Sequence, residues 1–220
     1  MNKPKNIIVF IALVALGVLF QSWGFYGHRR INRMAVFTLP PEMIGFYKAN
    51  IEYITAHAVD PDKRRYAVEG EAPKHFIDID HFAKEREDPF KVMPKYWYEA
   101  VNKYSEDTLQ AYGIVPWHVA NMTRWLTKAF EEKDANKILY LSSDLGHYIA
   151  DAHVPLHTTE NYNGQMTGQK GIHGLWESRI PELTADDYDY LVGRAKYIKS
   201  PLNAIWKAVE ESHSHLDSVL

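Results

Sequence analysis

Cysteine is absent from the 220-residue sequence. The chain therefore forms no disulfide bond and offers no thiolate to a metal, so its stability depends on packing and on any metal held by nitrogen and oxygen ligands. An excess of positive charge is also lacking, because the formal net charge is −3. This balance argues against tight binding to duplex nucleic acid through a basic surface. The sequence shows no internal repeat, low-complexity tract or second domain.

The longest apolar run, residues 7–20, is shorter than the roughly 20 residues that a membrane-spanning helix needs. Two lysines precede this run and Ser22 follows it, which is typical of a secretory signal peptide. Phe20 departs from the usual small residue before the cleavage point, and an uncleaved anchor is the alternative. We expect residues 1–22 to be removed, leaving a single domain at 23–220 that is exported, either periplasmic or secreted.

Sequence signals for strands are weak, whereas apolar residues recur at helical spacing along most of the remaining chain. The pattern predicts helices over residues 29–38, 116–130 and 134–152, and another after Pro201. Asp134 is a candidate N-cap for the third of these helices. The sequence therefore predicts a mostly α, single-domain helical bundle.

Five potential metal ligands are concentrated in the second half of the chain, as His147-x3-Asp151-x5-His157 and His173-x3-Glu177. His147 and Asp151 form one pair with the i,i+4 spacing that puts side chains on one helix face, and His173 and Glu177 form another. Each pair alone also fits a solvated ion pair or a buried histidine. Together they indicate a metal-dependent hydrolase. Histidine and carboxylate ligands without thiolates suit zinc, manganese or iron, and zinc is favoured among hydrolases.

Three further clusters lie upstream. Asp60 and Asp62 stand directly before the cations of residues 63–65, which could also be a capped turn with solvated charges. Residues 74–82 alternate polar and apolar side chains, as a half-buried extended segment does. Residues 23–28, Trp-Gly-Phe-Tyr-Gly-His, stand at the expected mature N-terminus, where the tryptophan could also be a structural plug.

Taken together, these clusters resemble the zinc-dependent phospholipase C and single-strand-specific nuclease superfamily. The matching motifs are an N-terminal Trp with Gly-x-x-Gly-His, an Asp about 15 residues before His-Phe-x-Asp, His-x3-Asp-x5-His and His-x3-Glu. They run in family order from Trp23 to Glu177. The resemblance implies a helical phosphodiesterase with three Zn²⁺ ions in a cleft between helices. It implies no protein partner, so we expect a monomer.

The resemblance also assigns ligands. The implied sets are Trp23 (through its free α-amino nitrogen and carbonyl oxygen), His28 and Asp151 for one zinc; Asp60, His75, His147 and Asp151 for the second; and His157, His173 and Glu177 for the third. Asp60 would also orient the attacking water and act as general base. Asp62 competes for the role of Asp60, which we prefer because its distance of 15 residues from His75 fits the nuclease branch.

Substrate class is the least specific inference. Lys63 is a candidate for binding phosphate, although the spacing does not choose among the cations 63–65. Phe76 could stack on a base while Asp78 reads its edge, but this motif is found in both branches of the superfamily. Gly-x-x-Gly-His after Trp23 and the distance from Asp60 to His75 resemble the nuclease branch and slightly favour single-stranded nucleic acid. The alternatives are a phospholipase C acting on phospholipid headgroups, favoured by Glu177 as the last ligand, and a non-catalytic metal-binding protein. The chain ends without a helix stop signal, which fits either a natural short form or a sequence that lacks a terminal helix.

Overall fold

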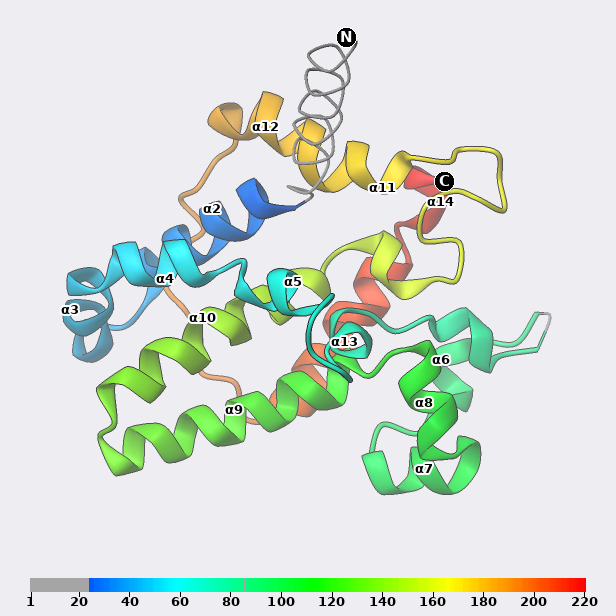
Figure 1. The fold of residues 1–220 in the computed structure, drawn as a ribbon, viewed down its shortest axis with the longest axis horizontal. Helices are drawn as coiled ribbons and strands as arrows, with labels where there is room; N and C mark the ends of the chain where they lie inside the picture. Colours follow the sequence, from blue (N-terminus) through cyan, green and yellow to red (C-terminus); the bar gives the residue numbers. More distant parts are fainter. Residues whose placement is uncertain (1–23, 85) are drawn as a thin grey trace, which may run out of the picture.

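The computed structural model describes residues 24–84 and 86–220; the expected signal peptide and Trp23 lie outside these ranges. No strand occurs in the described part of the chain, so the prediction of a mostly α fold is confirmed (Figure 1). Its α-helices are α2 (Phe25–Ala35), α3 (Pro41–Ala49), α4 (Ile51–His57), α5 (Asp60–Arg64), α6 (Pro89–Val92), α7 (Trp97–Tyr104), α8 (Glu106–Tyr112), α9 (Val115–Glu132), α10 (Ala135–Asp151), α11 (Ile172–Gly174), α12 (Ile180–Thr184), α13 (Pro201–His213) and α14 (Leu216–Val219). Short 3₁₀-helices are η1 (Val36–Thr38), η2 (Ala72–His75), η3 (Ile79–Phe82), η4 (Pro155–Thr158) and η6 (Ala185–Asp187), and η5 (Leu175–Arg179) is a π-helix.

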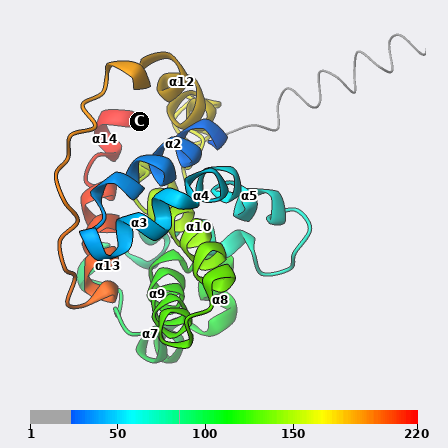
Figure 2. The same ribbon diagram turned by 90° about the vertical axis from the view of Figure 1, so that its left-hand side faces the viewer.

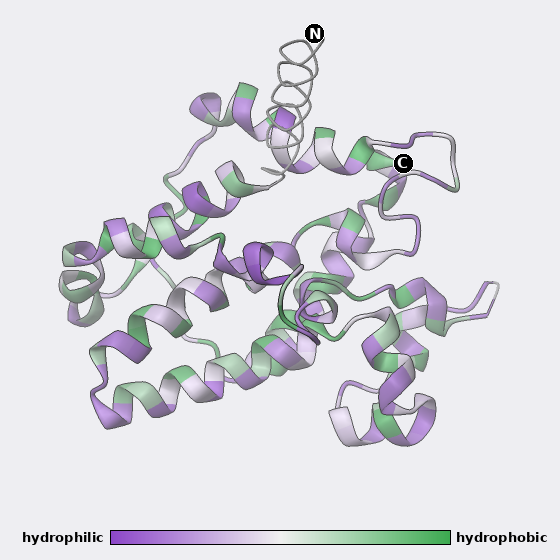
Figure 3. Cartoon of the chain, in the orientation of Figure 1, coloured by the Kyte–Doolittle hydropathy of each residue, from purple (hydrophilic) through white to green (hydrophobic). Residues whose placement is uncertain are grey.

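The two longest helices, α9 and α10, pack against each other as an antiparallel pair (Figure 1). Lys133 adopts the left-handed conformation at the end of α9, with φ of 56°. Asp134 then caps α10 by accepting a hydrogen bond from the backbone N–H of Lys137, as the sequence predicts. Hydrophobic and hydrophilic residues alternate around both helices (Figure 3), so each presents one apolar face to its neighbours.

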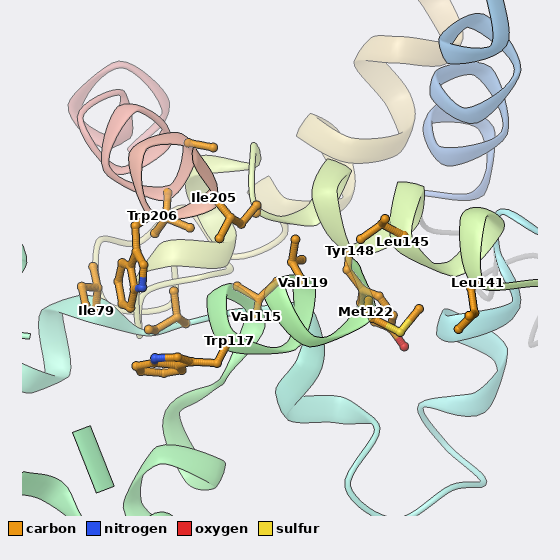
Figure 4. Close-up of a cluster of buried hydrophobic side chains, with 14 of the residues drawn as sticks. Ile79, Val115, Trp117, Val119, Met122, Leu141, Leu145, Tyr148, Ile205 and Trp206 are labelled. Atoms are coloured by element: carbon orange, nitrogen blue, oxygen red, sulfur yellow. The ribbon is translucent and has the colours of Figure 1, made fainter. Parts of the chain in front are cut away.

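The hydrophobic core lies where α13 packs on α9 and α9 packs on α10 (Figure 4). The indole rings of Trp117 and Trp206 meet edge to face, with centroids 5.2 Å apart. Both indole N–H groups donate to the backbone carbonyl of Lys95, at 2.9 and 3.3 Å. The polar atoms of these large side chains are therefore satisfied inside the core.

The other face of α10 is covered by α2 and α4, and α5 follows α4 closely (Figure 2). This face carries His147 and Asp151, so the helix that contributes to the core also carries the predicted ligands. An extended segment, residues 188–199, runs along the side of the molecule opposite α5 (Figure 2). Among the described residues, no helix combines the length and the apolar character needed to cross a membrane.

Candidate metal centre

Helix α10 places His147 and Asp151 one turn apart on the same buried face, with His147 Nε2 3.2 Å from Asp151 Oδ2. His147 Nδ1 donates to the backbone carbonyl of Ala58 at 2.9 Å, which leaves Nε2 as the acceptor that faces the centre. Both side chains are almost completely buried. The helical spacing in the sequence therefore corresponds to a real pair of converging ligand atoms.

Close packing of α2 against α10 brings His28 to the same point. A Cβ atom at Gly146 would lie 2.1 Å from Asn32 Oδ1, so only glycine fits there. Asn32 donates to the carbonyl of Ser143 at 2.9 Å and ties α2 to α10 at this crossing. One turn earlier on α2, the ring of His28 stacks on that of His147 with centroids 3.9 Å apart. No periodic pattern in the sequence marks Gly146 or Asn32, so neither residue is predicted from it.

The carboxylate of Asp151 faces two different groups of ligands. Its Oδ1 lies 3.4 Å from His28 Nε2, whereas its Oδ2 lies 2.9 Å from His75 Nδ1 and 3.2 Å from His147 Nε2. A carboxylate whose two oxygens point to separate nitrogen sets has the geometry of a bridge between two cations. The structure thus brings together the residues that the resemblance assigned to the first two zinc ions, Trp23 and Asp60 aside.

The structure places Asp62, not Asp60, in this cluster. Asp62 Oδ1 lies 3.6 Å from His147 Nε2 and 3.8 Å from His75 Nδ1. Asp60 points away and pairs with His57 Nδ1 at 2.6 Å and with Lys63 Nζ at 2.8 Å. The preference for Asp60 is therefore corrected. The cause is helix phase: two residues apart on a helix, side chains point about 200° away from each other.

His157, His173 and Glu177 form a separate group. Glu177 Oε1 lies 2.7 Å from His157 Nε2, and its Oε2 lies 3.0 Å from His173 Nε2. The Nδ1 atoms of the two histidines face the backbone carbonyls of His75 and Tyr162, at 2.8 and 3.0 Å. Glu177 is on the π-helix η5, a local widening of the helix that is common at functional sites. All three predicted ligands of this group therefore converge.

The N-terminal end of the described chain is anchored next to both groups. Gly24 is buried, has φ of 76°, and donates its N–H to Ser178 Oγ at 2.7 Å. A Cβ at this position would come within 3.5 Å of Glu177 Oε2 and 3.4 Å of a ring carbon of His28. Trp23, the predicted α-amino ligand, lies outside the described residues. A pocket with about 120 Å³ of free volume opens between α2, the end of α10 and η5, with His28 and Glu177 in its wall.

Burial and mutual charge set the protonation of these groups. Burial disfavours charge on His147 and His157, but the neighbouring carboxylates, Asp151 for the first and Glu177 for the second, raise the pKa of each to about 9. Burial lowers the pKa of His75, which is therefore held neutral. The positive charges of His147 and His157 keep the pKa of Asp151 well below its ordinary value, although burial opposes this shift. Positive charge is thus strongly favoured at the centre of the cluster.

Nitrogen and oxygen atoms converge here in the way that a metal ion requires. Three groups of ligand atoms, each with all atoms within 4.8 Å of one another, are His28, Asp62 and His147; His75, His147 and Asp151; and His157, His173 and Glu177. Two pairs of ring nitrogens approach closely, His75 Nδ1 to His147 Nε2 at 3.1 Å and His157 Nε2 to His173 Nε2 at 3.4 Å. Imidazole and carboxylate sets of this kind suit zinc.

The predicted substrate-binding residues lie around this centre with different surroundings. Lys63 is half-exposed and engaged with Asp60, so its assignment to phosphate is not supported by its position. Phe76 and Asp78 precede and follow the buried Ile77, and both remain partly accessible. Burial, followed by the charges of Asp80 and Glu160, raises the pKa of Asp78 to about 7, against the opposing charge of His157.

The two arginines after Lys63, Arg64 and Arg65, lie in different surroundings. Arg64 is turned inward and donates to Asp144 at 2.7 Å, next to the buried carboxylate of Glu71. Arg65 is exposed, and its positive charge lowers the pKa of His157, although the carboxylates around His157 raise that pKa overall. Of the three cations at residues 63–65, Arg65 is therefore the one whose charge acts on the group formed by His157, His173 and Glu177.

A helical fold that gathers imidazoles and carboxylates into groups able to hold a metal ion is typical of a metalloprotein. The sequence family described as zinc dependent phospholipase C matches residues 27–216. The chain belongs to this family, which confirms the predicted superfamily and its dependence on zinc. No individual protein with a curated description matches the sequence.

Proposed function

We propose that this protein hydrolyses phosphodiester bonds at a centre of three zinc ions, and that phospholipid is its preferred substrate class. The carboxylate of Asp151 carries the proposal, because its two oxygens face different nitrogen sets only 2.9–3.4 Å away. Family membership supports the lipid substrate. With Asp62 in place of Asp60, the spacing to His75 becomes 13 residues, which weakens the earlier preference for nucleic acid.

The ligand sets follow from the distances. His28 and Asp151 Oδ1 would hold the first ion with the N-terminal residue; Asp62, His75, His147 and Asp151 Oδ2 the second; and His157, His173 and Glu177 the third. Three dications against the carboxylates of Asp62, Asp151 and Glu177 give a formal surplus of three positive charges. Such a surplus suits an anionic phosphodiester and its more highly charged transition state.

When bound, zinc lowers the pKa of a coordinated water to near 7 and polarises phosphoryl oxygens. The residues of the chain position the reactants. Asp62 is partly accessible and can accept a proton from the attacking water, and Arg65 can pair with a phosphoryl oxygen. Water adds to phosphorus, the bond from phosphorus to the leaving oxygen breaks, and that oxygen takes up a proton. The products are an alcohol and a phosphomonoester.

Single-stranded nucleic acid is the second candidate. Among the described residues, no hydrogen bond to the carboxyl group of Asp78 is formed, and this group lies near His157. With its pKa at about 7, it can donate or accept a hydrogen bond at neutral pH, as reading the edge of a base would need. Phe76, two residues earlier, offers a partly accessible ring for stacking.

We further propose that residues 1–22 direct export of the protein and that their cleavage after Ser22 creates a ligand. The anchoring of Gly24 N–H on Ser178, against His28 and Glu177, supports a ligand role for the residue that precedes it in the sequence. Cleavage would give Trp23 a free α-amino group, whereas an intact peptide bond has no lone pair to offer a metal. The precursor would then be inactive.

One experiment tests the function. The processed protein is analysed for zinc and assayed on phosphatidylcholine vesicles, single-stranded DNA and RNA, with Asp151→Asn as the matched inactive variant. We expect about three zinc ions per chain, as the three ligand sets imply, and release of phosphocholine that the variant lacks. Nucleotide release without lipid cleavage would support the second candidate. Zinc binding with turnover of none of the three substrates would overturn the enzymatic proposal.

A further inference from the structure

The histidines of the metal centre are not all held in the same way. His147, His157 and His173 each direct Nδ1 to a backbone carbonyl, at 2.8–3.0 Å, and turn Nε2 toward the cluster. His75 is reversed. Its Nδ1 faces the cluster, 2.9 Å from Asp151 Oδ2, so that Nε2 points out of the cluster into the protein. Once a metal occupies Nδ1, the proton of the neutral ring must be on Nε2.

The group that faces His75 Nε2 is the carboxylate of Glu71. Its Oε1 lies 4.0 Å from that nitrogen, one helical turn earlier in the chain. His75 Nε2 is buried and has no hydrogen-bond partner in the described part of the chain. Glu71 is itself 2% exposed. A buried carboxylate thus stands behind His75, whereas backbone carbonyls stand behind His147, His157 and His173, and Nδ1 of His28 has no hydrogen-bond partner among the described residues.

Glu71 is fixed by a network that contains no metal ligand other than His75. Lys74 Nζ lies 2.7 Å from its Oε2, the hydroxyl of Tyr148 donates to its Oε1, and Arg64 Nη2 lies 3.4 Å away. Arg64 also pairs with the buried Asp144 at 2.7 Å. Two cations balance two carboxylates, so the charge of Glu71 is compensated without help from His75.

We propose that Glu71 is a positioning residue for His75, accepting the Nε2–H bond of this ligand and holding Nδ1 toward the metal. The inference rests on the ligand sets proposed above. Closing the present distance by about 1 Å brings it into the range of a hydrogen bond. A carboxylate in this position fixes the tautomer and the orientation of the ring and increases its strength as a ligand. His75 is then the histidine of the centre whose donor strength is set by a charged side chain.

Glu71→Gln and Asp144→Asn provide the test. Both substitutions neutralise a buried carboxylate that contacts Arg64, but only the first alters the partner of His75. Zinc affinity is measured by competition with a chelator on the protein as its host processes it. The absorption spectrum of the cobalt-substituted protein reports ligand geometry. We expect Glu71→Gln to weaken one zinc site by about 10–100-fold and to change the cobalt spectrum. Asp144→Asn should lower the melting temperature and leave zinc affinity unchanged.

Wild-type affinity in Glu71→Gln, or an equal loss in Asp144→Asn, would overturn the proposal. Should Glu71→Gln fail to fold, Tyr148→Phe decides, because it removes a donor that competes with His75 for Oε1. Its zinc affinity should then equal or exceed that of the wild type, and a decrease would contradict the inference. Zinc binding by the wild type without hydrolysis would refute the proposed function alone. A wild type that binds no zinc would refute both.

Discussion

Exchanging the two aspartates of α5 for asparagine, one at a time, separates a metal ligand from a surface ion pair. Asp62 Oδ1 lies within 3.8 Å of ring nitrogens of both His75 and His147. Among the ionisable groups of residues 24–84 and 86–220, Asp60 pairs with Lys63 and His57 only. Removal of partners outside the ligand shell costs about 10–100-fold in metal affinity. If Asp62 is a direct ligand, as proposed, its loss should therefore lower zinc affinity by more than about 100-fold, or about 2.7 kcal/mol.

Asp60→Asn is the matched control, since it removes the same charge two residues away. Its ion pairs are partly exposed and contribute about 0–1 kcal/mol to stability, with no expected change in zinc affinity. The assay is zinc competition by a chelator, followed by hydrolysis of phosphatidylcholine at saturating zinc. If Asp60→Asn lost zinc and Asp62→Asn kept it, the placement of α5 described above would be wrong and the spacing of 15 residues would be the correct guide.

Three further perturbations test other parts of the centre. Asp151→Asn should reduce bound zinc to about one ion per chain and Glu177→Gln to about two, because only Asp151 faces two ligand sets; equal stoichiometries by metal analysis would contradict a bridging role. One extra residue before Trp23 should remove about one zinc and most activity, since it takes away the α-amino ligand; retention of both would refute the link to processing. His118→Gln should make the free energy of unfolding less dependent on pH below neutrality. Burial, then Lys74, lowers the pKa of His118 to about 4. Between pH 6.5 and 4 the unfolded chain therefore binds a proton that the folded protein does not. Acidification over this range should lower the free energy of unfolding of the wild type by about 3 kcal/mol more than that of the variant. Urea unfolding of both proteins with a chelator present measures the difference, and parallel profiles would disprove it.

The long helices and the convergence of most candidate ligands could be predicted because their signals are local. Apolar spacing and the Asp134 cap define α10, and the i,i+4 rule puts His147 and Asp151 on one face. The choice between Asp60 and Asp62 could not be made in this way. Either spacing to His75 is compatible with a ligand, and only the rotation of α5 about its axis decides which carboxylate points inward.

Residues that act through tertiary contacts left no pattern in the sequence. Glu71 reaches Tyr148 across 77 positions, and Asn32 reaches the backbone of Ser143 across 111. Gly146 resembles any helical glycine until the side chain of Asn32 is seen to occupy the space of its missing Cβ. Such contacts depend on how α2 and α10 cross, and no periodicity within either helix encodes that crossing.

The orientation of the ligands depends more on backbone positions than on neighbouring side chains. The carbonyls of Ala58 and Tyr162 fix the rings of His147 and His173, and any residue supplies a carbonyl. Substitutions at these two positions should therefore leave the rings in place, provided that the backbone keeps its conformation. Glu71 is the exception, because the orientation it gives to His75 comes from a side chain. A single substitution can thus change the strength of this ligand without moving a helix.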